Sequence, residues 1–154
     1  MHVQPNASYM QAMIPIPAAP AVAASLLVQF LANQVCAGFP SPAEDLGAER
    51  LDLAALLVPN PQATFFMRAS GVSMVNFGIN DQDILVVNKS KRPRHGLIVV
   101  AAVDGEFTVK KLYKKLGRIK LVAGNPTYPD ITPKDEQTLQ IWGVVTSVIK
   151  IFPA

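Results

Sequence analysis

The sequence predicts a mostly β, barrel-like domain that is preceded by short helices and an N-terminal arm. Short apolar runs separated by turn residues fill the second half of the 154 residues. Asp104-Gly105 lies between two of these runs, and this dipeptide is typical of a two-residue β-hairpin turn. The first 35 residues are instead rich in proline, alanine and small polar residues. Hydrophobic residues make up 50% of the chain, which is enough for one domain with its own core.

The N-terminal arm contains one apolar patch, between Leu26 and Leu31. Its spacing predicts a short helix from Ala21 to Asn33. Such a helix cannot bury its apolar face alone, so we expect it either to dock on the remaining domain or to stay mobile.

A segment rich in glycine and proline follows, Gly38 to Glu44, and it excludes a regular element before Ser41. Ser41 has the character of a helix N-cap, with Pro42 at the first helical position and Glu44 completing a capping box. A short helix is expected to start there. A second short helix is predicted across Asp52 to Val58, before two further prolines.

The rest of the chain has the pattern of strands. Six are predicted: Thr64 to Arg68, Ile84 to Val87, Leu97 to Val103, Glu106 to Leu112, Arg118 to Val122 and Leu139 to Phe152. The last run is long enough to bend across two sheets, and Gly143 offers a place for the bend.

Charge is distributed unevenly along the chain, whose net charge is +3. Every lysine and arginine lies at or beyond Arg50, and two basic clusters stand out: Lys89, Lys91, Arg92 and Arg94, and then Lys110, Lys111, Lys114, Lys115, Arg118 and Lys120. Basic clusters can bind nucleic acid, but no helix-turn-helix, zinc-ligand spacing or stacking-aromatic motif accompanies these two. Direct DNA contact is therefore left open.

The expected location is the cytoplasm, without a membrane anchor. Prolines interrupt the early apolar stretch well before the roughly 20 residues of a membrane span, and the positively charged start of a signal peptide is missing. The single cysteine, Cys36, suits a reducing compartment. It has no recognisable catalytic surroundings, so it is predicted to be a thiol in the arm. The sequence predicts no metal site and no cofactor.

The segment Ala69 to Met74 is the candidate nucleophile turn, because it directly follows the predicted strand Thr64 to Arg68. A small-residue turn that leaves a strand can expose a hydroxyl together with nearby backbone N–H groups, as a nucleophile and its oxyanion hole require. Ser-Gly-x-Ser also occurs in ordinary turns, so the turn alone does not decide the function.

A catalytic serine needs a base, and the candidates are histidine and lysine. His2 lies in the loose N-terminus, and His95 lies in a turn, where a surface imidazole is the simpler interpretation. Strand alternation sorts the predicted strand Glu106 to Leu112 into two faces: Thr108, Lys110 and Leu112 on one, and Phe107, Val109 and Lys111 on the other. One of the two lysines must therefore point toward an apolar face.

Several segments together resemble a known family. They are Gly38-Phe39-Pro40-Ser41-Pro42-Ala43, Ala69-Ser70-Gly71-Val72-Ser73-Met74, Gly78-Ile79, Asp81 with Asp83, His95-Gly96, the run from Ala101 to Lys110, and Trp142-Gly143-Val144-Val145. In this order and spacing, the stretch from Gly38 to Phe152 resembles the LexA/UmuD family of serine-lysine self-cleaving proteins, and in particular UmuD and its plasmid-borne relatives. The resemblance implies a LexA/UmuD-type β domain.

The resemblance also implies catalytic roles. Ser73 takes the place of the nucleophile, Lys110 that of its base, and Ala37-Gly38 that of the cleaved bond. The chain would then divide into an arm, residues 1–37, and a protease-like domain, residues 38–154. In the predicted hairpin Lys110 lies across from Val99, and apolar neighbours would lower its pKa from about 10.4 toward 7. The backbone N–H groups of Ser73 and Val72 are the candidate oxyanion donors.

The partners implied by the resemblance belong to SOS mutagenesis. They are a second copy of the chain in a homodimer, a RecA filament on single-stranded DNA as activator, and a UmuC-like Y-family polymerase that uses the processed form in translesion synthesis.

The sequence departs from the family pattern at Asn76, Phe77, Gln82 and Asn88, where relatives more often have Asp, Gly, Gly and Asp. These differences concern the shape of loops. Two other functions stay open. One is a non-cleaving dimeric binding module or repressor-like regulator, although no helix-turn-helix precedes the domain. The other is a signal-peptidase-like enzyme, which would need a membrane anchor.

Overall fold

Two antiparallel sheets form the fold. The computed structural model describes residues 16–17, 25–31, 34–40, 47–134 and 138–154. The larger sheet has seven strands in the order β1-β4-β5-β9-β6-β7-β8. Its strands are β1 (Ile16–Pro17), β4 (Thr64–Arg68), β5 (Ile84–Asn88), β6 (Ile98–Val103), β7 (Glu106–Lys115), β8 (Arg118–Val122) and β9 (Leu139–Ile149). The smaller sheet pairs β2 (Leu27–Leu31) with β3 (Ala48–Asp52).

Short helices connect these strands. The α-helix α2 (Leu53–Leu57) follows β3, the 3₁₀ turn η2 (Pro61–Ala63) precedes β4, and the 3₁₀ turn η3 (Val75–Phe77) lies between β4 and β5. Together they confirm the predicted mostly β architecture with a few small helices. None of the helices in the described ranges is long and apolar enough to cross a membrane.

The strands of the second half are confirmed within a few residues of their predicted bounds. β4 and β8 match the prediction, whereas β7 runs three residues further, to Lys115. The hairpin between β6 and β7 turns at Asp104 and Gly105, whose φ angles of 50° and 83° both lie in the left-handed region. This is the conformation for which Asp-Gly is the preferred sequence.

The long strand β9 lies in the middle of the large sheet, between β5 and β6. Its register with β6 shifts between Val100 and Ala101, next to Gly143. A Cβ at Gly143 would lie 2.7 Å from a methyl carbon of Val87, so the close packing of β5 requires glycine here. The register shift of β9 thus lies at Gly143, where a bend was predicted. However, β9 joins two halves of one sheet and does not pass from one sheet to another.

Each face of the large sheet carries its own apolar cluster. Met67, Ala69, Met74, Ile79, Leu85, Val87 and Val100 form one, and Val99, Ala101, Leu112, Leu121 and Val144 form the other. Neighbouring residues of β6 alternate between the two, as the strand period of two requires. All the residues of both clusters come from beyond η2.

The predicted helix from Ala21 to Asn33 is wrong, because Leu27–Leu31 is strand β2. Its five residues pair in antiparallel register with Asp52 to Ala48 of β3, a partner about twenty residues away in the sequence. Backbone pairing with this partner outweighs the weak helical spacing of a short segment. The helix predicted to begin at Ser41 falls on residues 41–46, outside the described residues, and the chain is already a strand at Ala48.

The second predicted helix, α2, is confirmed. The Asp52 carboxylate accepts a hydrogen bond from the Ala55 N–H at 3.2 Å, which makes Asp52 the N-cap. The same carboxylate accepts from the Leu26 N–H at 3.1 Å, so one side chain ties the helix to the chain just before β2.

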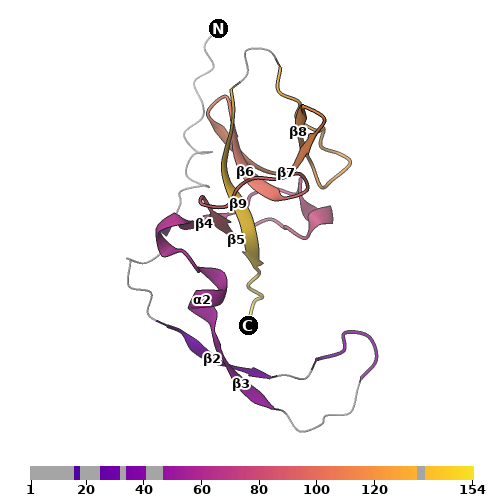
Figure 1. Cartoon of the computed structure of the whole chain (residues 1–154). Helices are drawn as coiled ribbons and strands as arrows, with labels where there is room; N and C mark the ends of the chain where they lie inside the picture. Colours follow the sequence, from indigo (N-terminus) through magenta and orange to yellow (C-terminus); the bar gives the residue numbers. More distant parts are fainter. Residues whose placement is uncertain (1–15, 18–24, 32–33, 41–46, 135–137) are drawn as a thin grey trace.

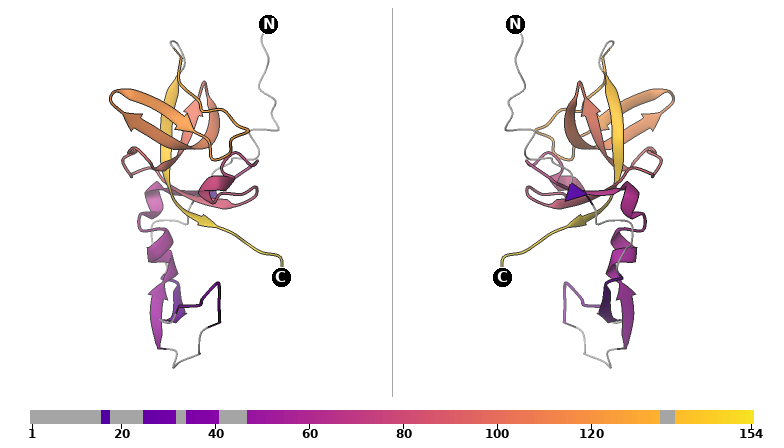
Figure 2. Two further views of the ribbon diagram at one scale, coloured as in Figure 1. Left: turned by 90° about the vertical axis from the view of Figure 1, so that its right-hand side faces the viewer. Right: turned by 90° about the vertical axis from the view of Figure 1, so that its left-hand side faces the viewer.

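The two sheets lie at opposite ends of the molecule. The large sheet is strongly curved, and the β2–β3 hairpin extends below it, joined through α2 (Figures 1 and 2). One part of the N-terminal arm returns to the large sheet, where Ile16 and Pro17 pair with Phe66 and Phe65 at the β4 edge.

Candidate active site

The turn after β4 is closed by hydrogen bonds to the segment that leads into β5. The Ala69 N–H donates to the Asp83 carbonyl at 2.8 Å, and the Gln82 N–H donates to the Ala69 carbonyl at 2.9 Å. The Gly71 N–H donates to the Asp81 carboxylate at 2.7 Å. Gly71 has a φ of +90°, a conformation that side chains other than glycine rarely adopt. The turn therefore has a defined shape two residues before Ser73.

A second segment, residues 123–125, holds the other side of this turn. The Gly124 N–H donates to the Ser73 carbonyl at 2.7 Å, and the Asn76 N–H donates to the Gly124 carbonyl at 2.8 Å. The Asn125 side-chain Nδ2 donates to the Val72 carbonyl at 3.0 Å. The carbonyl groups of both Val72 and Ser73 are thus fixed by this segment, which we call the 124–125 strap.

Glycine is required at position 124 by packing. A Cβ there would lie 2.6 Å from Cδ2 of Phe77 and 3.1 Å from Cα of Met74. These distances are shorter than ordinary van der Waals contact, so any side chain would push the strap away from the turn.

Lys110 reaches Ser73 from strand β7. It pairs with Val99 of β6, as predicted, and only 7% of its surface is exposed. Its Nζ lies 3.0 Å from Ser73 Oγ, 3.0 Å from Thr108 Oγ1 and 3.0 Å from the Val109 carbonyl oxygen. The structure therefore places together the serine and the lysine that the sequence singled out.

The surroundings of Lys110 favour its neutral form. Burial lowers the pKa of the Lys110 amine below its ordinary value of 10.5, because the charged form loses its hydration among apolar neighbours. Within the described residues, no carboxylate forms an ion pair with Lys110; the two ion pairs found there join Lys120 to Asp130 and Lys150 to Asp83. Among the described residues, the charged form is therefore stabilised by hydrogen bonds to neutral oxygens and by no ion pair.

The three oxygen partners fit a neutral amine. Such an amine has two N–H donors and one lone pair. The Val109 carbonyl can only accept, and the Thr108 hydroxyl can accept the second N–H. In the structure Nζ donates to Ser73 Oγ; when the amine is neutral, its lone pair can take the place of that N–H and accept the Ser73 hydroxyl proton. This arrangement is the one that general-base activation of a serine needs.

The neighbouring Lys111 faces the other side of the sheet, as alternation predicts. It is half-buried rather than fully solvated, and its Nζ lies 4.8 Å from the centre of the Phe77 ring. Lys111 is therefore partly packed, in a cation–π contact with Phe77.

The candidate oxyanion donors have no other hydrogen-bond partner among the described residues. Neither the Val72 N–H nor the Ser73 N–H donates a hydrogen bond to any residue that the structure describes. Val72 is 44% exposed, so the site is open to an incoming carbonyl group.

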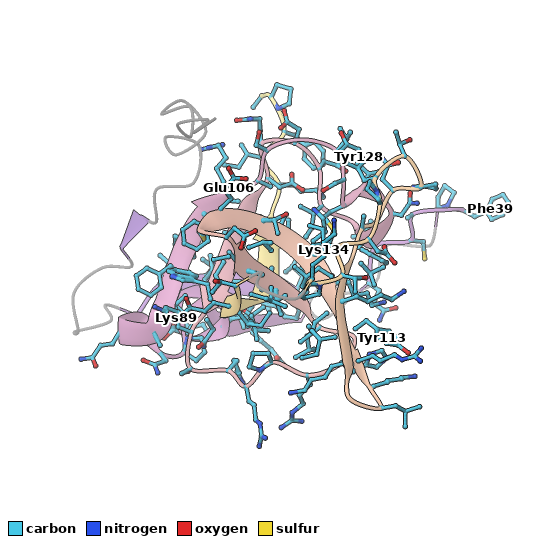
Figure 3. All side chains as sticks on the ribbon, turned by 90° about the horizontal axis from the view of Figure 1, so that it is seen from above. Phe39, Lys89, Glu106, Tyr113, Tyr128 and Lys134 are labelled. Atoms are coloured by element: carbon cyan, nitrogen blue, oxygen red, sulfur yellow. The ribbon has the colours of Figure 1, made fainter. Side chains whose placement is uncertain are left out.

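The predicted scissile segment is not at the site. Ala37 and Gly38 are exposed and lie in the connection that leaves β2, on the hairpin that extends away from the large sheet (Figure 1). Phe39, which follows the predicted bond, is 91% exposed and projects outward at the edge of the molecule (Figure 3). The structure does not bring this segment to Ser73.

Other candidate residues have simpler roles. Nδ1 of His95 accepts a hydrogen bond from the Lys114 N–H at 3.2 Å, and the imidazole ring packs edge-on against Tyr113. Cys36 is exposed, and His2 lies outside the described residues. In the part of the chain that the structure describes, no group of three His, Cys, Asp or Glu side chains is placed to hold a metal ion. The basic residues of the 89–94 cluster are exposed.

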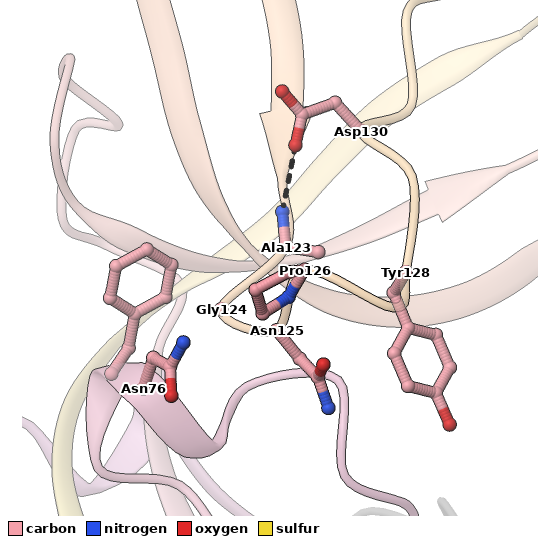
Figure 4. Close-up of a pocket in the computed structure, with 8 residues that line it drawn as sticks. Asn76, Ala123, Gly124, Asn125, Pro126, Tyr128 and Asp130 are labelled. Atoms are coloured by element: carbon pink, nitrogen blue, oxygen red, sulfur yellow. Dashed lines mark hydrogen bonds between the residues drawn. The ribbon is translucent and has the colours of Figure 1, made fainter.

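A pocket borders the 124–125 strap. It is lined by Asn76, Phe77, Ala123, Gly124, Asn125, Pro126, Tyr128 and Asp130. The Asp130 carboxylate accepts from the Ala123 N–H at 3.2 Å, whereas the Asn125 amide points away from Asp130, toward the ribbon before η3 (Figure 4).

Sequence reasoning missed three residues at this site: Thr108, Gly124 and Asn125. Thr108 was placed on the same face as Lys110 but was given no role. Gly124-Asn125-Pro126 has the composition of a turn, and this signal could have marked the segment. Its approach to a serine fifty residues earlier in the chain could not have been found from local pattern.

Comparison with known proteins adds an independent line of evidence. Residues 29–146 match the family model described as Peptidase S24-like. This range contains Ser73, Lys110 and the predicted scissile bond.

Individual relatives cover most of the chain. Protein SamA of Salmonella typhimurium is 51% identical over 113 residues, which are 73% of this chain and 78% of that protein. Protein ImpA of Escherichia coli is 42% identical over 134 residues, 86% of this chain and 90% of its own length. The LexA repressor of Erwinia tasmaniensis is 43% identical over 91 residues, 58% of this chain and 45% of the repressor.

Proposed function

The chain belongs to the peptidase S24-like family, to which LexA and the UmuD-like proteins belong, and from this we propose that it is a self-cleaving SOS mutagenesis protein. Ser73 is the nucleophile, Lys110 its base, and Ala37-Gly38 the bond that is cut. The observation that carries the proposal is the 3.0 Å contact between Lys110 Nζ and Ser73 Oγ at a buried amine whose pKa is lowered.

The proposed reaction proceeds in two steps. Neutral Lys110 accepts the Ser73 hydroxyl proton while Oγ attacks the Ala37 carbonyl carbon, and the negative oxygen is held by the backbone N–H groups of Ser73 and Val72. Lys110 then returns the proton to the Gly38 nitrogen as the peptide bond breaks, which leaves Ala37 as an ester on Ser73. A water molecule, deprotonated in turn by Lys110, hydrolyses this ester and regenerates the serine.

The cleavage segment must move to be cut. Because Ala37 and Gly38 lie on the extended hairpin, either this hairpin swings toward Ser73 or the segment enters the site of a second copy of the chain. Both routes are compatible with a homodimer.

The biological role follows by analogy with the family. Cleavage releases residues 1–37, and residues 38–154 act as the accessory subunit of an error-prone UmuC-like Y-family polymerase in translesion synthesis. A RecA filament on single-stranded DNA is the proposed activator, and the cytoplasm is the proposed location. Identity of 51% to SamA and 42% to ImpA, each over most of the chain, supports placing it among the UmuD-like proteins.

Incubation of the purified chain at alkaline pH, followed by mass spectrometry, tests the proposal. We expect two products that divide between Ala37 and Gly38. Ser73→Ala should remain uncut, with a rate at least about 10³-fold lower, since loss of the nucleophile removes the covalent route. A product that begins elsewhere would disprove the site. A Ser73→Ala chain that is cut at the normal rate would disprove the nucleophile.

A further inference from the structure

We propose that Asn125 is a positioning residue for self-cleavage: its side-chain amide orients the Val72–Ser73 peptide so that the Ser73 N–H faces the incoming carbonyl. This inference rests on the proposed function, because it names the group that prepares the oxyanion site of the same reaction. Asn125 would act through the backbone and would not touch the substrate.

The orientation of the Asn125 amide is fixed from two sides. Its Oδ1 accepts a hydrogen bond from the Thr127 N–H at 3.0 Å, and its Nδ2 donates to the Val72 carbonyl at 3.0 Å. A backbone N–H can only donate and a carbonyl can only accept, so the oxygen and nitrogen ends of the amide cannot be exchanged. Figure 4 shows the side chain leaving the strap in this direction.

Holding the Val72 carbonyl also directs the Ser73 N–H. The peptide unit is planar and trans, and the described chain contains no cis peptide bond, so C=O and N–H point to opposite sides. With the carbonyl turned toward Asn125, the Ser73 N–H points away from the strap. It makes no hydrogen bond to another described residue, and it belongs to the residue whose Oγ attacks. The donor and the nucleophile can therefore reach the same carbonyl group.

Asparagine satisfies both contacts at this position, whereas aspartate, which has the same shape, does not. Aspartate would keep the bond from Thr127 but would place a carboxylate oxygen 3.0 Å from the Val72 carbonyl oxygen, with no proton between them. Two acceptors at that distance repel, which would turn the Val72–Ser73 peptide away from its orientation. Gly124 supports the same geometry, since its N–H holds the next carbonyl, that of Ser73.

The pH dependence of self-cleavage tests this role in Asn125→Asp and Asn125→Ala. We expect the plateau rate of each variant to fall by at least tenfold, toward the 10²- to 10³-fold loss of a missing oxyanion donor. The pH at which the rate is half-maximal should not change in Asn125→Ala, because the contacts of Lys110 are retained. Asn60→Asp is the matched control: it makes the same chemical change at an exposed residue before β4 whose side chain makes no cap hydrogen bond. Its rate should equal that of the wild type.

Amide NMR spectra recorded near pH 6, where cleavage is slow, test the same role without catalysis. The Ser73 N–H resonance should shift or broaden in both Asn125 variants and keep its position in Asn60→Asp. If this resonance does not move, or if both variants retain the wild-type plateau rate, the role of Asn125 is refuted. If the resonance moves as expected but the wild-type chain does not cleave itself, the proposed function fails while the orienting contact stands.

Discussion

Lys110 is buried, and it has no compensating carboxylate among the described residues. Most buried lysines are paired with such a partner. The three oxygens around its Nζ satisfy a neutral amine. At the scale of single residues, the proposed activity therefore depends on the free-energy cost of protonating the buried Lys110 amine.

Replacing the two neighbouring lysines should separate their roles. Lys110→Ala is expected to reduce self-cleavage by about 10²- to 10⁴-fold, the usual contribution of a general base. Lys111→Ala should leave the rate unchanged and lower the free energy of unfolding by about 0.5–1 kcal/mol, since it removes only the contact with Phe77. Cleavage rates and urea unfolding of both variants provide the measurement. Equal loss of activity in both, at unchanged stability, would contradict the assignment.

The rate of self-cleavage should depend on pH through the base. Below the lowered pKa of Lys110 the amine is charged and cannot accept a proton, so the rate should rise about tenfold per pH unit and level off above that pKa. The midpoint should lie below 10.5, the ordinary pKa of a lysine. Melting temperatures recorded at each pH distinguish this rise from a general loosening of the fold. A flat profile would rule out a titrating lysine as the base.

The lowered pKa of Lys110 also affects the free energy of unfolding. A salt-bridged lysine, whose pKa is raised, contributes less stability as the pH rises, whereas Lys110 should contribute more. Between the lowered pKa in the folded chain and 10.5 in the unfolded chain, the unfolded state binds the additional proton, so stability from this group increases with pH. In a Ser73→Ala background, which prevents cleavage, the chain with Lys110 should gain stability relative to Lys110→Met as the pH rises through this window. Denaturant titrations of the two chains at several pH values measure the difference. A difference that stays constant with pH would contradict the lowered pKa.

The pairing of Ser73 with Lys110 could be predicted at this scale because both signals are local. Strand alternation required one of two neighbouring lysines to point toward an apolar face, and the resemblance selected Lys110 and Ser73. Asn125 and Thr108 could not be assigned in the same way, because their roles depend on hydrogen bonds to residues in other segments. Gln82 is an intermediate case: the sequence marked it as an unusual turn residue, and its φ of 70° does lie in the left-handed region.

At the scale of elements, the 124–125 strap determines the shape of the turn that carries Ser73. Gly124→Ala should lower the free energy of unfolding by about 1–3 kcal/mol, because its methyl group would overlap Phe77 and approach the Met74 backbone. Gly47→Ala is the control, since nothing lies within 4 Å of a Cβ there and its φ is not in the left-handed region. Its effect should stay within about 0.5 kcal/mol. Thermal or urea unfolding of both variants measures the contrast, and equal stability would show that the strap can move without cost.

Strands were predicted well where turn residues flank segments with a regular strand pattern, as in the hairpin of β6 and β7. The failure at β2 has a different origin. The segment Leu27–Leu31 has five residues and no strong periodicity, so its conformation is decided by its partner β3 and not by its own sequence. The order of strands in the large sheet, with the last strand in its middle, also follows from packing that no single segment encodes.

At the scale of the whole molecule, the apolar clusters belong entirely to the proposed domain. The first residue of either cluster along the chain is Met67, and every cluster residue lies beyond the proposed cleavage site. A chain of residues 38–154 should therefore fold alone and melt within a few degrees of the uncut chain. Of the strand pairs described in the large sheet, it loses the two-residue pairing of β1. Circular dichroism melting compares the two. An unfolded fragment would show that residues 1–37 belong to the folded domain.

The position of the scissile segment between β2 and β3 has a consequence for what happens after a cut. While the chain is intact, β2 and β3 are tethered by the loop that joins them, and each faces the other at a high effective concentration. Cleavage between Ala37 and Gly38 would place β2 on one product and β3 on the other, which turns their pairing into a bimolecular equilibrium. Two-stranded sheets are marginally stable even when they are tethered. Apart from this pairing, the described part of the arm is paired with the large sheet only through the two residues of β1. Dilution would therefore favour release of the arm and oppose reversal of the cut.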